Sequence, residues 1–174
     1  LDRQGFLEDF DASEGLWTIH SENQQQSWVW DVPDFEGYAG DPGNKAWFTR
    51  PLTSENGSLE NSWIQSPCYD LHAVERPLIR MDIMRSFVPY VDGAVLQYKE
   101  AVDGSWKTLG GDTPGKEWYN AFNILNTPGG SSVGWALEAF TPDRDWVTAV
   151  HDLDQVAGKP GVSFRIVITS TGAQ

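Results

Sequence analysis

Apolar and polar residues alternate with a period of two along several short segments of this chain. The clearest case is 162–169, where Val162, Phe164, Ile166 and Ile168 fall on one side and polar residues occupy most of the other side. Successive side chains of a β-strand point to opposite faces of the sheet, so this period predicts a strand with one buried face. No segment keeps an apolar period of 3.6 residues over three turns, so we expect no long amphipathic helix.

The other predicted strands are also short, and glycine- and proline-containing loops separate them. They lie at 5–10, 16–20, 27–32, 45–49, 61–65, 78–86, 117–122 and 146–151, with a hairpin at 94–109 that turns at Gly104 and single helical turns at 70–74 and 152–157. Many short strands at fairly regular spacing are typical of an all-β sandwich. At 174 residues, we expect residues 1–174 to form a single domain with a substantial core.

The acidic net charge of the chain argues against some classes of binding partner and permits others. The formal net charge is −13, with 25 acidic and 12 basic residues. Nucleic acid needs a basic surface, so it is not an expected partner, and no apolar run is long enough for membrane insertion. Carboxylates in this number permit Ca²⁺, which prefers oxygen ligands.

The single cysteine and the ends of the chain give two further expectations. Cys68 has no partner for an internal disulfide, and we expect a buried, unreactive thiol. The chain starts at Leu1 and its only methionines are Met81 and Met84. We therefore expect a piece excised from a longer protein.

Several motifs in order carry a resemblance to a known module. They are FLEDFD at 6–11, SWVWDVP at 27–33, NSWIQSPCYDL at 61–71, DGAVLQYKE at 92–100, DWVTAVHDL at 145–153 and VSFRIVI at 162–168. The series resembles a jelly-roll module of secreted, multidomain proteins of Bacteroidetes-type bacteria, which is similar to MAM domains, reelin subrepeats and cleaved-adhesin domains. The resemblance implies a two-sheet antiparallel jelly-roll sandwich without a catalytic centre. It also implies an extracellular or cell-surface location beside other domains of the parent protein.

The resemblance further implies a structural calcium ion near the first strand, with ligands by position among Glu8, Asp9 and Asp11, joined by an acid from a later loop or strand. The residues themselves suggest a second calcium candidate. Between 31 and 44 the chain carries several acids and glycines and one amide, among them Asp34, Asp41 and Asn44. Such a loop can wrap carboxylate and carbonyl oxygens around the ion, although a solvated loop would look the same.

Nine tryptophans in one domain serve either as core anchors or as a ligand platform. Most of them lie in the segments that carry the resemblance, where we expect core positions. The long glycine-containing segment 120–140 is a candidate binding loop. Its neighbourhood supplies our predicted exposed platform, which consists of Trp135, Tyr119, Phe122 and Phe140. Aromatic rings bind sugars by stacking on their apolar C–H faces, whereas packing within the core is the alternative role.

These observations predict a non-catalytic binding or adhesion module, calcium-stabilised and directed at a polysaccharide or a cell-surface protein. One alternative is a jelly-roll glycosidase or polysaccharide lyase with paired carboxylates, for which Glu138 is the best candidate. Another is a structural spacer or protein–protein adhesion domain. His20, His72 and His151 lack zinc-motif spacing, so no zinc site is expected.

Overall fold

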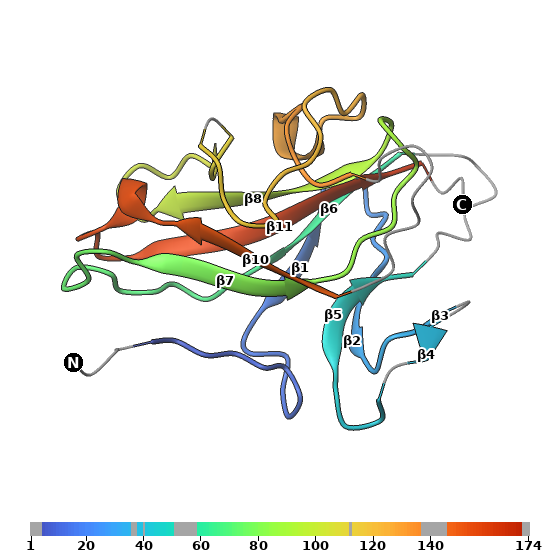
Figure 1. Cartoon of the computed structure of the whole chain (residues 1–174), viewed down its shortest axis with the longest axis horizontal. Helices are drawn as coiled ribbons and strands as arrows, with labels where there is room; N and C mark the ends of the chain where they lie inside the picture. The colour runs from blue at the N-terminus through green and yellow to red at the C-terminus, as the bar shows by residue number, and fades with distance from the viewer. Residues whose placement is uncertain are drawn as a thin grey trace.

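The structure is a computed structural model that describes residues 5–35, 38–39, 41–50, 59–111, 113–136 and 146–171 (Figure 1). Over these residues the chain forms antiparallel strands and two short 3-10 helices, η1 (Pro128–Gly130) and η2 (Asp154–Val156), with no α-helix. The predicted antiparallel all-β class is therefore confirmed. The jelly-roll connectivity stays a prediction.

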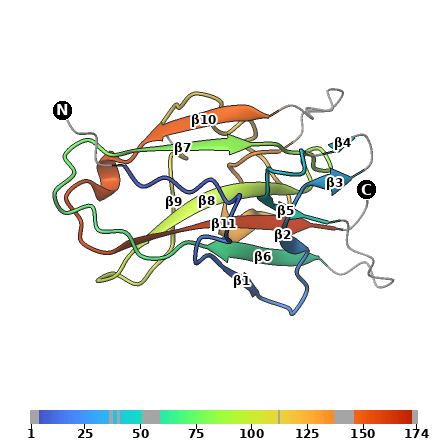
Figure 2. The ribbon, with the colours of Figure 1, turned by 90° about the horizontal axis from the view of Figure 1, so that it is seen from below.

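The largest unit is a five-stranded sheet with β11 at its centre. Its strand order is β1 (Thr18–Ser21), β6 (Glu60–Gln65), β11 (Val162–Ser170), β8 (Gly93–Glu100) and β9 (Lys107–Thr108). All neighbouring strands are antiparallel. Strand β11 pairs along most of its length with β6 and β8, so segments from the middle and the end of the chain form one continuous surface (Figure 2).

Three two-stranded sheets complete the strands of the described residues. They are β10 (Val147–Asp152) with β7 (Leu78–Ile83), β2 (Trp28–Asp31) with β5 (Ala46–Thr49), and β3 (Asp34–Phe35) with β4 (Tyr38–Ala39). The main core joins Leu96 and Ile168 of the large sheet to Ala149 of β10 and Trp28 of β2. The inner face of the large sheet is therefore covered by β7–β10 and β2–β5, giving a two-layer packing.

Among the described residues, helix η1 covers one end of the opposite, outer face of the large sheet. Helix η1 contacts β8 and β11 there, and Val95 and Val167 on this face are fully buried. The segment beside η1 pairs with the edge of β8, because Trp135 and Ala94 exchange two backbone hydrogen bonds of 2.8 Å. This approach requires Gly134, since a Cβ atom there would lie 2.3 Å from the carbonyl oxygen of Ala94.

Most of the predicted strands are confirmed, including those at 27–32, 61–65, 78–86, 146–151 and 162–169 and the 94–109 hairpin. The predicted strand at 5–10 is wrong. In that segment, the carboxylates of Glu8 and Asp9 accept hydrogen bonds from backbone N–H groups two residues further on, and the segment pairs with no strand. Such local bonds compete with a sheet ladder.

Two further expectations are corrected. The segment 117–122 is a loop with one isolated bridge of its own, Ala121–Gly134, and the residue before it, Lys116, forms another with Val150. Cys68 is exposed, because the next residue, Tyr69, pairs with Val162 and turns its own ring toward Phe164. The turn predicted at 152–157 is confirmed as η2. Within the described residues, no helix has the length and apolarity needed to cross a membrane.

Candidate functional site

Trp135 does not form an exposed platform. Its side chain is only 3% exposed, and its indole packs edge-on against Trp118 and Tyr119 at centroid distances of 4.9 and 4.8 Å. The indole Nε1 donates to the carbonyl oxygen of Glu117 at 3.3 Å. The expectation of an exposed Trp135 is therefore wrong, because pairing with Ala94 turns this side chain into the core.

Tyr119 also has a structural position. Its hydroxyl donates to the carbonyl oxygen of Leu96 and accepts from the Leu96 N–H, both at 3.1 Å. These bonds bridge the edge of β8 between the pairings made by Trp135 and by Leu109. Burial raises the pKa of Tyr119 well above its ordinary value. The ring is half-buried and offers little surface to a ligand.

Phe122 is the predicted platform residue that the structure leaves open to solvent. Its side chain is 70% exposed, and those of Leu125 and Tyr90 are 74% and 45% exposed. Two backbone hydrogen bonds join their segments, from Leu125 N to the Tyr90 oxygen at 2.9 Å and from Asn126 N to the Val91 oxygen at 3.0 Å. We call Tyr90, Phe122 and Leu125 the apolar tip.

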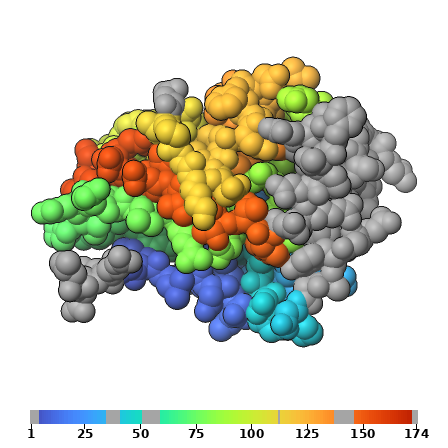
Figure 3. All heavy atoms as spheres, in the orientation of Figure 1, coloured from blue at the N-terminus to red at the C-terminus, as the bar shows by residue number. Residues whose placement is uncertain are grey.

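Figure 3 shows the two segments of the apolar tip meeting on one surface, the green of the chain near residue 90 against the orange of the 120s. Sequence analysis selected only Phe122 from this group. Tyr90 and Leu125 were missed, because their proximity depends on pairing between loops that are distant along the chain. Phe140 lies outside the described residues.

A buried carboxylate holds the base of the apolar tip in place. Asp92 is nearly inaccessible and accepts from Asn126 Nδ2 at 2.8 Å and from the Thr171 backbone N–H and hydroxyl at 3.0 and 2.9 Å. Ile124, beneath the same loop, is also buried. The loop is thus anchored on both sides of its exposed side chains, which gives a preformed surface.

The predicted calcium ligands do not converge on one point in the structure. Glu8, Asp9 and Asp11 are exposed, and the bonds of Glu8 and Asp9 are the local ones described above. Asp34 and Asp41 are also exposed, as is Asn44, whose backbone N–H donates to the Asp41 carbonyl. In the described ranges, no three His, Cys, Asp or Glu side chains group closely enough to hold a metal ion.

Glu60 is a buried carboxylate that the sequence analysis missed. Its Oε1 accepts from the Ser27 backbone N–H at 2.8 Å, from the Ser27 hydroxyl at 3.1 Å and from the Ser62 hydroxyl. Oε2 is buried without a hydrogen-bond partner among the described residues. The alternation of β6 gives the signal, because it places Glu60 on the same inward face as Ser62 and Ile64. These bonds tie β6 to the start of β2.

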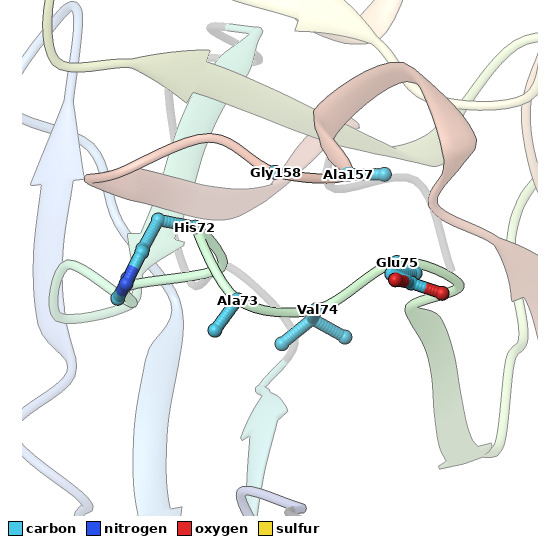
Figure 4. Close-up of a pocket in the computed structure, with 6 residues that line it drawn as sticks. All are labelled: His72, Ala73, Val74, Glu75, Ala157 and Gly158. Carbon is cyan, nitrogen blue, oxygen red and sulfur yellow. The ribbon is translucent and has the colours of Figure 1, made fainter.

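Over the described ranges, neither the histidines nor a surface hollow beside His72 brings catalytic groups together. His151 is buried against Trp118 and contacts the Thr113 hydroxyl at 3.0 Å, whereas the exposed His72 pairs with Asp70 at 2.9 Å. Hydrogen bonds from the His72 backbone and ring lower the pKa of Asp70. The hollow lies between 72–75 and 157–158, and its two titratable side chains, His72 and Glu75, lie at opposite ends of the 72–75 segment (Figure 4). Glu138 lies outside the described residues.

One solved structure is similar to this chain over most of its length. It is the K1 cleaved adhesin domain of Lys-gingipain from Porphyromonas gingivalis W83, with a TM-score of 0.46 and 12% sequence identity over 94% of this chain and 92% of that chain. This is one of the classes of module that the sequence motifs resemble. No protein-family model matches the chain, and no curated protein matches it in sequence.

Proposed function

We propose that this chain is a non-catalytic binding or adhesion module that contacts its ligand through the apolar tip. The observation that carries the proposal is the joint exposure of Tyr90, Phe122 and Leu125 on two loops fixed to each other. Large apolar side chains gathered on an anchored surface are typical of interaction sites. Such a site binds by preformed contacts and needs no reacting group.

A polysaccharide is the ligand class that we propose. The rings of Phe122 and Tyr90 are exposed, and aromatic faces stack on the apolar C–H faces of sugars. A cell-surface protein is the second candidate, because Leu125 extends the surface with an aliphatic group that suits a protein partner.

The remaining parts of the proposal rest on the sequence motifs. They include the jelly-roll connectivity, an extracellular or cell-surface location, attachment to other domains of a parent protein and stabilisation by calcium. The acids of segments 8–11 and 31–44 support calcium binding by their number and oxygen chemistry alone.

Native affinity electrophoresis against a panel of neutral polysaccharides tests the proposal. We expect one polysaccharide to retard the wild-type domain, and we expect Phe122→Ala and Leu125→Ala to abolish most of that retardation. Val102→Ala is the matched control, because Val102 is an apolar side chain in the β8–β9 turn that is exposed even more fully, at 92%. All three variants should keep the wild-type melting temperature.

Two outcomes would overturn the proposal. Release of reducing ends from the retarding polysaccharide would identify an enzyme instead. Equal binding by the Phe122 and Leu125 variants, with polysaccharide or with a protein partner, would remove the apolar tip from the site.

A further inference from the structure

A row of aromatic and cationic side chains crosses the open part of the outer face of the large sheet. We call it the cation–aromatic row, and its members are His20, Trp63, Arg165, Trp106 and Lys99. His20 stacks on Trp63 at 5.5 Å between centroids, and the Arg165 guanidinium lies 4.6 Å from the Trp63 ring and 4.4 Å from the Trp106 ring. Lys99 Nζ lies 4.8 Å from the Trp106 ring.

Strand register explains why these residues meet. His20 pairs with Trp63 across β1 and β6, and Arg165 pairs with Gln65 of β6 and Gln97 of β8. Cross-strand partners, and residues two apart in one strand, share a face of the sheet. The row therefore lies on the face opposite the main core and apart from the apolar tip.

Arg165 is held in one orientation at the centre of the row. Its Nε and Nη2 both donate to Gln97 Oε1, at 2.9 and 2.6 Å. Gln97 is 3% exposed, and its Nε2 donates to the Gly129 oxygen at 2.9 Å, so η1 fixes the acceptor. Burial lowers the pKa of the Arg165 guanidinium to about 10, which still leaves it charged at neutral pH.

The two cations of the row form no salt bridge within the described part of the chain. Neither Arg165 nor Lys99 forms a salt bridge with a described carboxylate, although acids outnumber bases by 25 to 12, and Lys107 and Lys159 both lie near Glu100. Arg165 Nη1 is neither hydrogen-bonded nor buried among the described residues. The carboxylate that acts on Arg165 electrostatically is Glu22, which accepts from Asn61 Nδ2 at 2.8 Å.

We propose that the cation–aromatic row is a second binding site, and that it takes an anionic polysaccharide whose sugar carboxylates bind Arg165 Nη1 and Lys99 Nζ. A fixed guanidinium beside an ammonium group is suited to charge-assisted hydrogen bonds with carboxylate. Gln65, Ser163 and Thr108 lie on the same face and can bond sugar hydroxyl groups.

The same geometry argues against other ligands. Each indole of the row already has two neighbours within 5.5 Å of its centroid, so neutral sugars and nucleic-acid bases find little free ring face for stacking. An extended acidic peptide would need partners for its backbone groups, which a sheet offers along its edges and not on its faces.

Polygalacturonate and its fully methyl-esterified form are the probes, since they share a backbone and differ in charge. We expect binding to polygalacturonate, at least tenfold weaker binding to the ester, and an affinity loss of about tenfold or more in Arg165→Met.

Lys99→Gln should also weaken polygalacturonate binding severalfold. It provides a test on a half-exposed residue if Arg165→Met unfolds. Glu22→Gln should tighten binding, because it removes a competing carboxylate. Phe122→Ala should leave binding unchanged, which separates this site from the apolar tip.

Three results would overturn the inference. They are no binding of polygalacturonate by the wild-type domain, equal binding of the acid and the ester, or unchanged affinity in both Lys99→Gln and Glu22→Gln. Equal competition by polyglutamate at matched carboxylate concentration would overturn the assignment of a polysaccharide, because charge alone would then account for the affinity.

Discussion

At the edge of β8, the Tyr119 hydroxyl forms hydrogen bonds with backbone groups, as a neighbouring strand does elsewhere in the sheet. This hydroxyl accepts from the Leu96 N–H at 3.1 Å and donates to the Leu96 carbonyl oxygen, which also accepts from the Leu109 N–H at 3.0 Å. Buried backbone groups that lack partners are costly, so this phenol supports the edge of the large sheet. Burial also raises the pKa of Tyr119. The free energy of unfolding should therefore depend on pH in the alkaline range.

Tyr119→Phe should therefore lower stability and change its pH dependence. Loss of both hydrogen bonds should reduce the free energy of unfolding by about 1–3 kcal/mol at neutral pH. In the wild-type protein the unfolded chain loses the phenol proton near the ordinary value of 10.0, whereas the folded chain keeps it. The contribution of Tyr119 is thus complete below that pH and falls by about 1.4 kcal/mol per pH unit above it.

Urea unfolding of both proteins on either side of that pH measures the effect. The variant should lose less stability than the wild type as the pH rises. Parallel losses in the two proteins would show that the Tyr119 phenol does not titrate differently in the folded chain.

At the scale of elements, the centre of the large sheet is unevenly buried. Ile64, Ile166 and Leu96 are cross-strand neighbours on the inner face of β6, β11 and β8. Leu96 and Ile64 are almost inaccessible, but Ile166 is only half-buried and packs against the margin of the core. Apolar residues at equivalent positions of neighbouring strands therefore stabilise the fold by different amounts, depending on how fully other elements cover each side chain.

Truncation of these neighbours should separate the two environments. Leu96→Ala should cost about 2–5 kcal/mol, because it removes buried methyl groups and leaves a cavity. Ile166→Ala should cost less, because part of that side chain already contacts water. Denaturant midpoints at constant slope measure both losses, and an equal or larger loss at Ile166 would contradict this assignment of the core.

At the scale of the whole molecule, the N-terminal segment carries several acidic residues and packs against the rest of the domain. Residues 5–17 form no strand, yet Phe6 contacts the ring of Tyr69 and the carbonyl of Phe10 accepts from Trp30 Nε1 at 2.8 Å. The acids Glu8, Asp9 and Asp11 lie on this segment. A cation bound there would favour the docked segment over the unfolded chain.

Calcium should consequently raise the melting temperature, and EDTA should lower it. The expected direction follows from preferential binding of the ion to the folded state. Melting curves with calcium, with EDTA and with magnesium as the control test this prediction. Identical melting in calcium and in EDTA would eliminate a structural calcium ion.

The alternation of apolar and polar residues indicated most of the segments that become strands, although the strands predicted at 5–10 and 117–122 were wrong. The patterns at 27–32, 78–86 and 162–169 predicted β2, β7 and β11, because a two-residue period is a local property of an extended chain. The glycine-containing turn after 100 likewise predicted the β8–β9 hairpin. These features led to the antiparallel all-β class without any knowledge of neighbouring segments.

Only the tertiary structure decided which side chains became buried or exposed. An alternating pattern separates two faces of a strand but does not say what covers either face. Trp135 therefore went to the core and Cys68 to the surface, against expectation. Tyr90 met Leu125, and Trp63 met Arg165, because backbone pairing between distant segments brought them together. Both candidate binding sites depend on such pairing, whose partners no single stretch of sequence encodes.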